Sequence, residues 1–263
     1  MRYLEYLTAT WEEFRDEIKE ESSLILIPVG CVEEHGPHLP LNTDCIIGET
    51  ICESVAQQTQ IILGPPIRYG VSRTTQGFPG TLEIRVDTLR ALTKDILYSF
   101  ASQGVKILIL FTWHGGTSHS MILREASIEV IERVRQEHHL PATLNESQLD
   151  ELPQIYLFSG VRMFDGQIKN QILALLDTEP SHAAELETSL MLYLQPDLVR
   201  EDKLEHLKEF PKIPEGRIFM RGSPWLKKGL MGDASHSTKE KGKKIFEIFI
   251  KELAQRIHKI RSS

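Results

Sequence analysis

The chain has 263 residues, of which 41% are hydrophobic and 25% charged, as is typical of soluble globular proteins. A formal net charge of −7 argues against a nucleic-acid-binding surface, and no apolar run is long enough to span a bilayer. The N-terminal residues lack a signal-peptide apolar region, and the three cysteines follow no disulfide spacing. We therefore expect a cytoplasmic protein with reduced cysteines and a single domain over residues 1–263.

Hydrophobic periodicity predicts strands that alternate with helices. In chain order we expect a helix at 11–20, a strand at 23–30, a helix at 44–58, a strand at 61–67 and a helix at 86–104. The second half adds a strand at 105–112, a helix at 120–139, a strand at 155–160, and helices at 183–194 and 237–260. Residues 200–233 read as an irregular excursion. This alternation predicts a three-layer α/β/α sandwich with a largely parallel central sheet.

Ionisable side chains gather in the loop GCVEEHGPHLPLNTD (30–44), directly after the first buried strand. A second polar loop, WHGGTSH (113–119), follows the strand at 105–112. Because ligands bind beyond the carboxyl ends of strands in open α/β sheets, we expect the two loops to converge. A third cluster, SHAAELE (181–187), opens a later helix.

Imidazoles and carboxylates of this kind form the ligand set of zinc, manganese or ferrous iron at hydrolytic sites. Glu33 and His35 share one side of an extended segment, Asp44 begins the next helix, and His114 ends the second strand. Two ions sharing a carboxylate would lower the pKa of a bridging water and polarise a carbonyl oxygen. The alternatives are a solvated turn for the loop and a capping or hydrogen-bonded role for His114.

The third cluster and the cysteines leave further alternatives open. His182 could cap the helix that it precedes, and Glu185 or Glu187 could favour its first turn, with one of them doing only that. Cys31 and Cys45 flank the first loop and could be ligands. Without a Cys-x-x-Cys pattern, we expect them to be small buried apolar residues.

Five segments in order resemble signatures of the creatininase (creatinine amidohydrolase) family. GCVEEHGPHLPLNTD is similar to its G-S-x-E-Q-H-G-P-H-L-P-L-x-T-D motif, and YGVSRTTQGFPGTLEI to its G-x-S…F-P-G-T segment. FTWHGGTSH resembles its N-G-H-G-G-N loop, SHAAELETSLML its H-A-G-x-x-E-T-S helix, and MGDASHSTKEKG its approach to the last helix. The resemblance implies a cytosolic, metal-dependent hydrolase of three-layered α/β fold and a homo-oligomer, either a hexamer or a dimer.

The resemblance also assigns roles to residues. Carried over position by position, the metal ligands fall on Glu33, His35, Asp44, His114 and Glu187, with Asp44 as the bridging carboxylate. His182 becomes the general acid or base, while Glu185 occupies a variable position. The implied cofactors are two divalent metal ions per chain, with zinc preferred and manganese or iron as alternatives.

The chain departs from the family pattern at several positions. Glutamine of the signature is Glu34 here, which we expect to act as an additional acid of the site. The Asn-Gly that opens the histidine loop is Thr112-Trp113, its closing Asn is Thr117, and a histidine before F-P-G-T is Thr75. Creatininases carry tyrosine and glutamate after the ligand histidine, where this chain has glycines, so creatinine itself is disfavoured as the substrate.

We therefore expect an amidohydrolase that cleaves an unusual C–N bond of a small molecule, a cyclic amide or a formamide, through a metal-bridging hydroxide. The alternatives are a formamidopyrimidine-nucleotide deformylase and a peptidase of the mycofactocin-precursor type. A deformylase needs a phosphate contact, for which Arg68, Arg73 and Arg221 are candidates. The non-enzymatic alternative is a metal-free scaffold or binding protein. No nucleic-acid or membrane partner is expected.

Overall fold

The computed structural model describes residues 2–19, 23–160, 166–212 and 226–262. The strands are β1 (Leu4–Glu5), β2 (Leu24–Val29), β3 (Ile62–Leu63), β4 (Ile107–Thr112), β5 (Gln154–Ser159), β6 (Lys208–Glu209) and β7 (Gly232–Asp233). The helices are α1 (Trp11–Glu17), α2 (Thr43–Thr59), α3 (Val86–Ser102), α4 (Thr117–Glu137), α5 (Glu146–Leu149), α6 (Gly166–Leu173), α7 (Glu185–Leu194) and α8 (Lys239–Ser262), with short 3₁₀ turns at Pro196–Leu198 and Glu201–Lys203.

The central sheet has the strand order β1-β3-β2-β4-β5, and every neighbouring pair in it is parallel. The middle strand β2 and its neighbour β4 are buried along their whole length. Such strands need apolar residues on both faces, which explains why their sequences, LILIPV and ILILFT, are almost continuously apolar rather than alternating.

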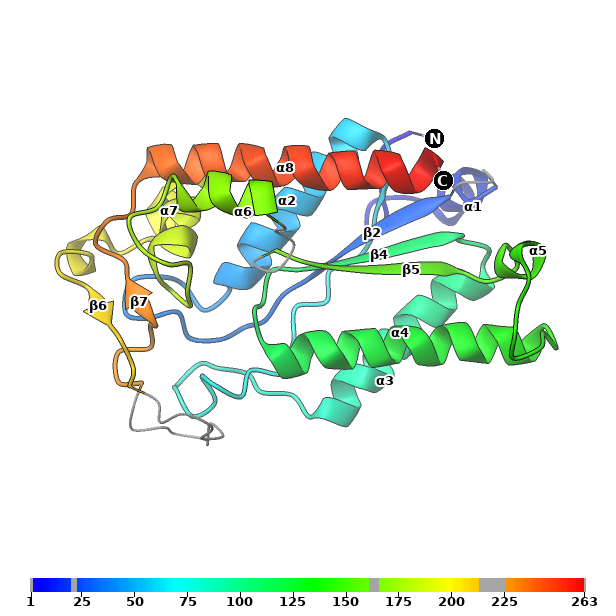
Figure 1. Cartoon of the computed structure of the whole chain (residues 1–263), viewed down its shortest axis with the longest axis horizontal. Coiled ribbons are helices and arrows are strands. Elements are labelled where there is room, and N and C mark those ends of the chain that lie inside the picture. Colours follow the sequence, from blue (N-terminus) through cyan, green and yellow to red (C-terminus); the bar gives the residue numbers. More distant parts are fainter. Residues whose placement is uncertain (1, 20–22, 161–165, 213–225, 263) are drawn as a thin grey trace.

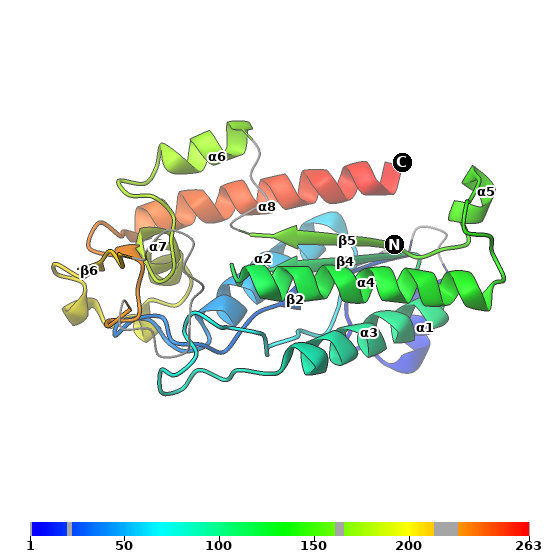
Figure 2. The ribbon, with the colours of Figure 1, turned by 60° about the horizontal axis from the view of Figure 1, so that its bottom comes forward.

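Helices cover both faces of the sheet (Figure 1). Leu24 and Leu26 of β2 belong to a core shared with α2, α7 and α8, whereas Ile25 and Ile27 belong to a second core shared with α1, α3 and α4. Figure 2 shows α8 on one side of the strands and α3 and α4 on the other. The predicted three-layer α/β/α sandwich with a largely parallel sheet is therefore confirmed.

Four strands differ from the sequence prediction. Two of them, β6 and β7, pair antiparallel within the stretch 200–233 that was expected to be irregular. The strand expected at 61–67 is only two residues long, because Pro65 and Pro66 have no N–H to donate to a neighbouring strand. Ile67 resumes the pairing through an isolated parallel bridge to Val29. The edge strand β1 was not expected and pairs with β3. In the described ranges, no helix is both long and apolar enough to cross a membrane.

The topology creates a crevice beside β2 and β4. These strands are neighbours, yet the helices that follow them pack on opposite faces: α2 contributes Ile47 and Ile51 to one core, and α4 contributes Ile122 and Leu123 to the other. The loops that leave β2 and β4 therefore lie side by side at the sheet edge before they lead to opposite faces, and this is where α/β proteins bind ligands. Both polar loops singled out in the sequence lie there.

Candidate metal centre

The loop after β2 buries its ionisable side chains instead of exposing them. Glu33 and His35 are both buried, and the Glu33 amide donates to Leu41 O, which folds the loop back on itself. At Gly30 a Cβ would lie 2.8 Å from Cys45 Sγ, so close packing of the loop on α2 requires glycine there. The solvated-turn interpretation of this loop does not fit its burial.

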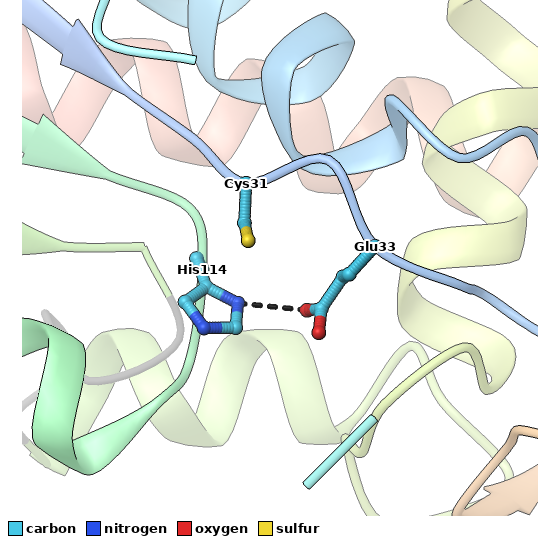
Figure 3. Close-up of side chains that lie close together, drawn as sticks. All are labelled: Cys31, Glu33 and His114. Carbon is cyan, nitrogen blue, oxygen red and sulfur yellow. Dashed lines mark ion pairs between the residues drawn. The ribbon is translucent and has the colours of Figure 1, made fainter. Parts of the chain in front are cut away.

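Asp44 joins the two loops. It lies buried in the first turn of α2, with Oδ2 3.1 Å from His114 Nδ1 and Oδ1 3.3 Å from His35 Nε2. His114 Nδ1 also lies 2.8 Å from Glu33 Oε1, a pair visible in Figure 3. The two oxygens of one carboxylate thus face two imidazoles that come from different strand ends, the arrangement expected of a bridging ligand.

Glu187 completes the cluster from α7. Its Oε2 lies 3.9 Å from His35 Nε2 and accepts a hydrogen bond from the Ala183 amide at 2.6 Å. Its Oε1 accepts one from the Trp113 indole N–H at 3.1 Å. All five predicted ligands therefore converge, although they lie up to 154 positions apart (Glu33 to Glu187, 187 − 33).

Hydrogen bonds at the far side of each ring determine which nitrogen faces the carboxylates. His114 Nε2 donates to Val71 O at 3.1 Å, which leaves Nδ1 toward Glu33 and Asp44. His35 Nδ1 donates to Glu33 O at 3.1 Å, which leaves Nε2 toward Asp44 and Glu187. That buried Nε2 has no hydrogen-bond partner among the described residues. Metal-ligating histidines are oriented in this way, by a carbonyl on the other ring nitrogen.

The electrostatics of the cluster call for positive charge. Burial alone would lower the pKa of His35, but Asp44, Glu187 and Glu33 raise it to about 10. Burial likewise opposes ionisation of His114, yet the charges of Glu33 and Asp44 raise its pKa well above the usual value. Without metal, protons on these two rings supply the positive charge that balances the carboxylates. Bound cations would supply the same charge. The donor set and its charge therefore fit divalent metal ions.

His182 and Glu34 form a second pair beside the cluster. His182 Nε2 lies 3.0 Å from Glu34 O and 3.3 Å from Glu34 Oε1. Both partners are acceptors, so Nε2 carries a proton and Nδ1 is left to exchange one. Burial and neighbouring His35 lower the pKa of His182, but the hydrogen bond to Glu34 and two further carboxylates raise it, and the net shift is upward. The His182 ring centre lies 4.6 Å from that of His35.

These residues surround a cavity of about 340 Å³. Its wall combines predicted ligands with uncharged and cationic groups from three other loops. It is lined by Glu33, Asp44, Ser72, Arg73, Thr74, Thr75, His114, Gly115, Gly116, Thr117, Ser181, His182, Leu186, Glu187 and Met231. Glu34 does not line this wall, and its carboxylate contacts His182 Nε2 instead. A cavity of this size suits a small ligand.

Three departures from the family pattern contact the cluster. Thr75 Oγ1 donates to Glu33 Oε2, Trp113 Nε1 donates to Glu187 Oε1, and Glu34 accepts from His182. Each substituted residue thus holds a group of the site. The sequence motifs showed that these positions depart from the family pattern, but not which group each side chain contacts.

Two further residues were not singled out in the sequence. Ser72 donates a hydrogen bond to the same oxygen of Glu33 as Thr75 does. His119 accepts from the Val71 amide through Nδ1 at 3.3 Å, and its ring lies edge-on to His114 with centres 5.0 Å apart. Val71 therefore links the two histidines. In the sequence, only their polarity could have pointed to a role in the site: Ser72 lies in a loop, and His119 follows His114 by five residues.

Glu185 has a different role from Glu187. It is buried, and its carboxylate accepts from the amides of Asp177 and Thr178, from the Thr178 hydroxyl and from Lys241 Nζ. These donors occupy its oxygens and tie the loop before α7 to α8. The structure thus places Glu185 away from the cluster, in a structural ion pair.

Replacing Lys241 by Met should destabilise the fold without affecting metal binding. The loss of a charged donor to buried Glu185 should lower the free energy of unfolding by about 1.5–3 kcal/mol. Urea unfolding measures this as a lower midpoint at unchanged slope. Lys243→Met, at an exposed position of the same helix, is the control. If the Lys241 variant were fully folded and still lost its metal, Glu185 would have to contribute to the metal centre, contrary to this assignment.

Known proteins resemble this chain over nearly its whole length. The family model described as creatininase (creatinine amidohydrolase) matches residues 8–257. The creatinine amidohydrolase of Pseudomonas putida is 27% identical over 94% of this chain and 94% of its own length. A mycofactocin precursor peptide peptidase of Mycolicibacterium smegmatis is 26% identical over 89% of this chain and 84% of its own. The solved structure of a mutant creatininase of Zn-Zn type matches with a TM-score of 0.82 at 23% identity, covering 98% of each chain.

Proposed function

Since the chain belongs to the creatininase family, whose members are metal-dependent amidohydrolases, we propose that it hydrolyses an unusual C–N amide bond of a small molecule. The substrate class we favour is a cyclic amide or a formamide. One observation carries the proposal: the two oxygens of buried Asp44 face ring nitrogens of His35 and His114 within 3.3 Å. Such an arrangement suits two divalent ions that share one carboxylate.

We propose that Glu33, Asp44 and His114 hold one ion and that His35, Asp44 and Glu187 hold the other. When bound, divalent ions polarise an amide carbonyl and lower the pKa of water at the site. Zinc, manganese and ferrous iron all accept this mixed imidazole and carboxylate set, and zinc remains our preferred assignment.

The remaining groups position the ligands and move a proton. Ser72 and Thr75 hold Glu33 Oε2, so its Oε1 stays directed at His114. In the proposed reaction, His182 donates a proton from Nδ1 to the leaving nitrogen, while Glu34 accepts from Nε2–H and keeps the ring in place. An imidazole whose pKa lies above its usual value is protonated in part at neutral pH and can act as this acid.

A formamidopyrimidine-nucleotide deformylase is the second candidate, because a cationic side chain, that of Arg73, is among the described residues that line the cavity. Arg73 lines the wall, where its guanidinium could contact a phosphate. Arg68 is committed elsewhere, in a two-point pair with Glu49 at 2.7 and 2.8 Å, and Arg221 lies outside the described residues. Arg73→Ala should then raise KM for the nucleotide at least tenfold and leave hydrolysis of uncharged amides unchanged.

Metal analysis followed by a substrate screen tests the proposal. We expect about two equivalents of divalent metal per chain, and metal-dependent turnover of at least one compound among creatinine, a formamidopyrimidine nucleotide assayed by formate release, and short peptides of the mycofactocin-precursor type. Far less than one equivalent after incubation with zinc, manganese and iron would favour the metal-free scaffold instead.

A homo-oligomer and a cytoplasmic location remain predictions. Size-exclusion chromatography with light scattering tests the oligomeric state.

A further inference from the structure

Cys31 differs from the other two cysteines in its surroundings. Cys52 packs in the hydrophobic core between α2 and the sheet, and Cys45 Sγ donates to Cys31 O and Arg68 O at 3.6 and 3.7 Å. Cys31 is fully buried but belongs to none of the hydrophobic clusters of the described residues, and its Sγ makes no hydrogen bond within them. A small apolar role explains Cys52 but not Cys31.

The Cys31 side chain points toward Glu33 and His114, two of the proposed metal ligands. Figure 3 shows Cys31, Glu33 and His114 directed toward one another from the ends of β2 and β4. Cys31 Sγ, a Glu33 oxygen and a His114 ring nitrogen all lie within 4.8 Å of one another. Three potential ligand atoms so close together, in a buried position, can bind a single ion with small side-chain rotations.

We propose that Cys31 Sγ is a ligand of the ion held by Glu33 and His114, so that this half of the centre binds metal through sulfur, nitrogen and oxygen. This inference rests on the proposed function, because it extends the same metal centre. On binding, the thiol releases its proton to solvent and the sulfur lone pair is donated to the ion. The divalent charge is what makes a thiolate tolerable next to the Glu33 and Asp44 carboxylates.

A sulfur ligand has a consequence for metal choice. Thiolate is a soft ligand that favours zinc and ferrous iron, whereas sites built of carboxylates and water suit manganese and magnesium. The Cys31 thiolate should therefore bias one ion position toward zinc, while the other, built from His35, Asp44 and Glu187, stays permissive. The two positions become chemically different.

X-ray absorption at the zinc edge tests this on the unmodified protein. After removal of metal with a chelator and reloading with zinc, we expect a sulfur scatterer at about 2.3 Å beside nitrogen and oxygen at about 2.0–2.2 Å. A loaded protein whose zinc shows only nitrogen and oxygen would overturn the role of Cys31 and leave the proposed function intact. A protein that binds manganese or iron but no zinc would also overturn the role of Cys31, and one that binds none of the three metals would overturn both.

Substitution gives a second readout that does not depend on turnover. In the cobalt-loaded protein, Cys31→Ser should lose the near-ultraviolet sulfur-to-metal charge-transfer band, and its preference for zinc over manganese should fall at least about tenfold. The control is Cys52→Ser, a buried cysteine remote from the cluster, which should change neither. An unchanged band and preference in Cys31→Ser would refute the assignment; if that variant does not fold, the absorption experiment on wild type decides.

Discussion

Asp44→Asn should abolish metal binding and activity together. The amide keeps the shape of the side chain but removes the negative charge that faces both His35 and His114. We expect metal content to fall from about two equivalents to below one, and hydrolysis of the substrate found in the screen to fall by at least about a thousandfold. Inductively coupled plasma analysis and steady-state kinetics measure the two effects.

Thermal unfolding gives an independent measure of the same change. At a free metal concentration 100 times its Kd, binding stabilises the native wild-type protein by about 2.7 kcal/mol, so its Tm should rise on adding metal. The Asp44→Asn variant should show no such rise. Glu49→Gln is the matched control, since Glu49 lies on the same helix and pairs with Arg68. Two tightly bound ions in Asp44→Asn would remove the bridging role from Asp44.

His182→Gln should separate chemistry from metal binding. The variant loses the proposed proton donor, so kcat should fall about 10²–10⁴-fold, the usual contribution of a general acid or base. Metal content should stay at two equivalents, because the five proposed ligands are untouched. His138→Gln, at a half-exposed position at the end of α4, is the control. A variant that keeps full kcat would assign proton transfer to another group.

Glu34→Gln should show how Glu34 acts on His182. The Glu34 carboxylate raises the pKa of His182 through its hydrogen bond to Nε2, so removing its charge should shift the His182 ionisation to lower pH. The pH profile of kcat should move in that direction while metal content stays unchanged. An unchanged profile would mean that the backbone oxygen of Glu34 alone holds the ring.

Three residues that depart from the family pattern have one feature in common, which is a hydrogen bond to a group of the site. Thr75, Trp113 and Glu34 replace other residue types, and each contacts a proposed ligand or the proposed acid. A decayed site would be expected to lose such contacts, whereas here the substituted side chains supply them. These contacts are therefore consistent with a metal centre that keeps its supporting hydrogen bonds.

Residue pattern alone was enough for the layered architecture and for the regions that form the centre. Continuous apolar runs marked β2 and β4 as strands buried on both faces, and polar loops directly after them had to lie at one sheet edge. The family resemblance then assigned Glu33, His35, Asp44, His114 and Glu187, and the structure brings all five together. The strand at β3 was predicted, but too long, because the effect of Pro65 and Pro66 on pairing depends on the neighbouring strand.

Only the tertiary structure decided what each neighbouring side chain does. Glu185 and Glu187 lie two positions apart on α7, so the helix turns them about 200° from each other and only one can face the cluster. Which one does so depends on how α7 packs against α2 and α8, a contact between segments remote in sequence. The same holds for Cys31. The sequence showed that it lies beside the first polar loop, but its side chain reaches Glu33 and His114 only because the ends of β2 and β4 lie next to each other.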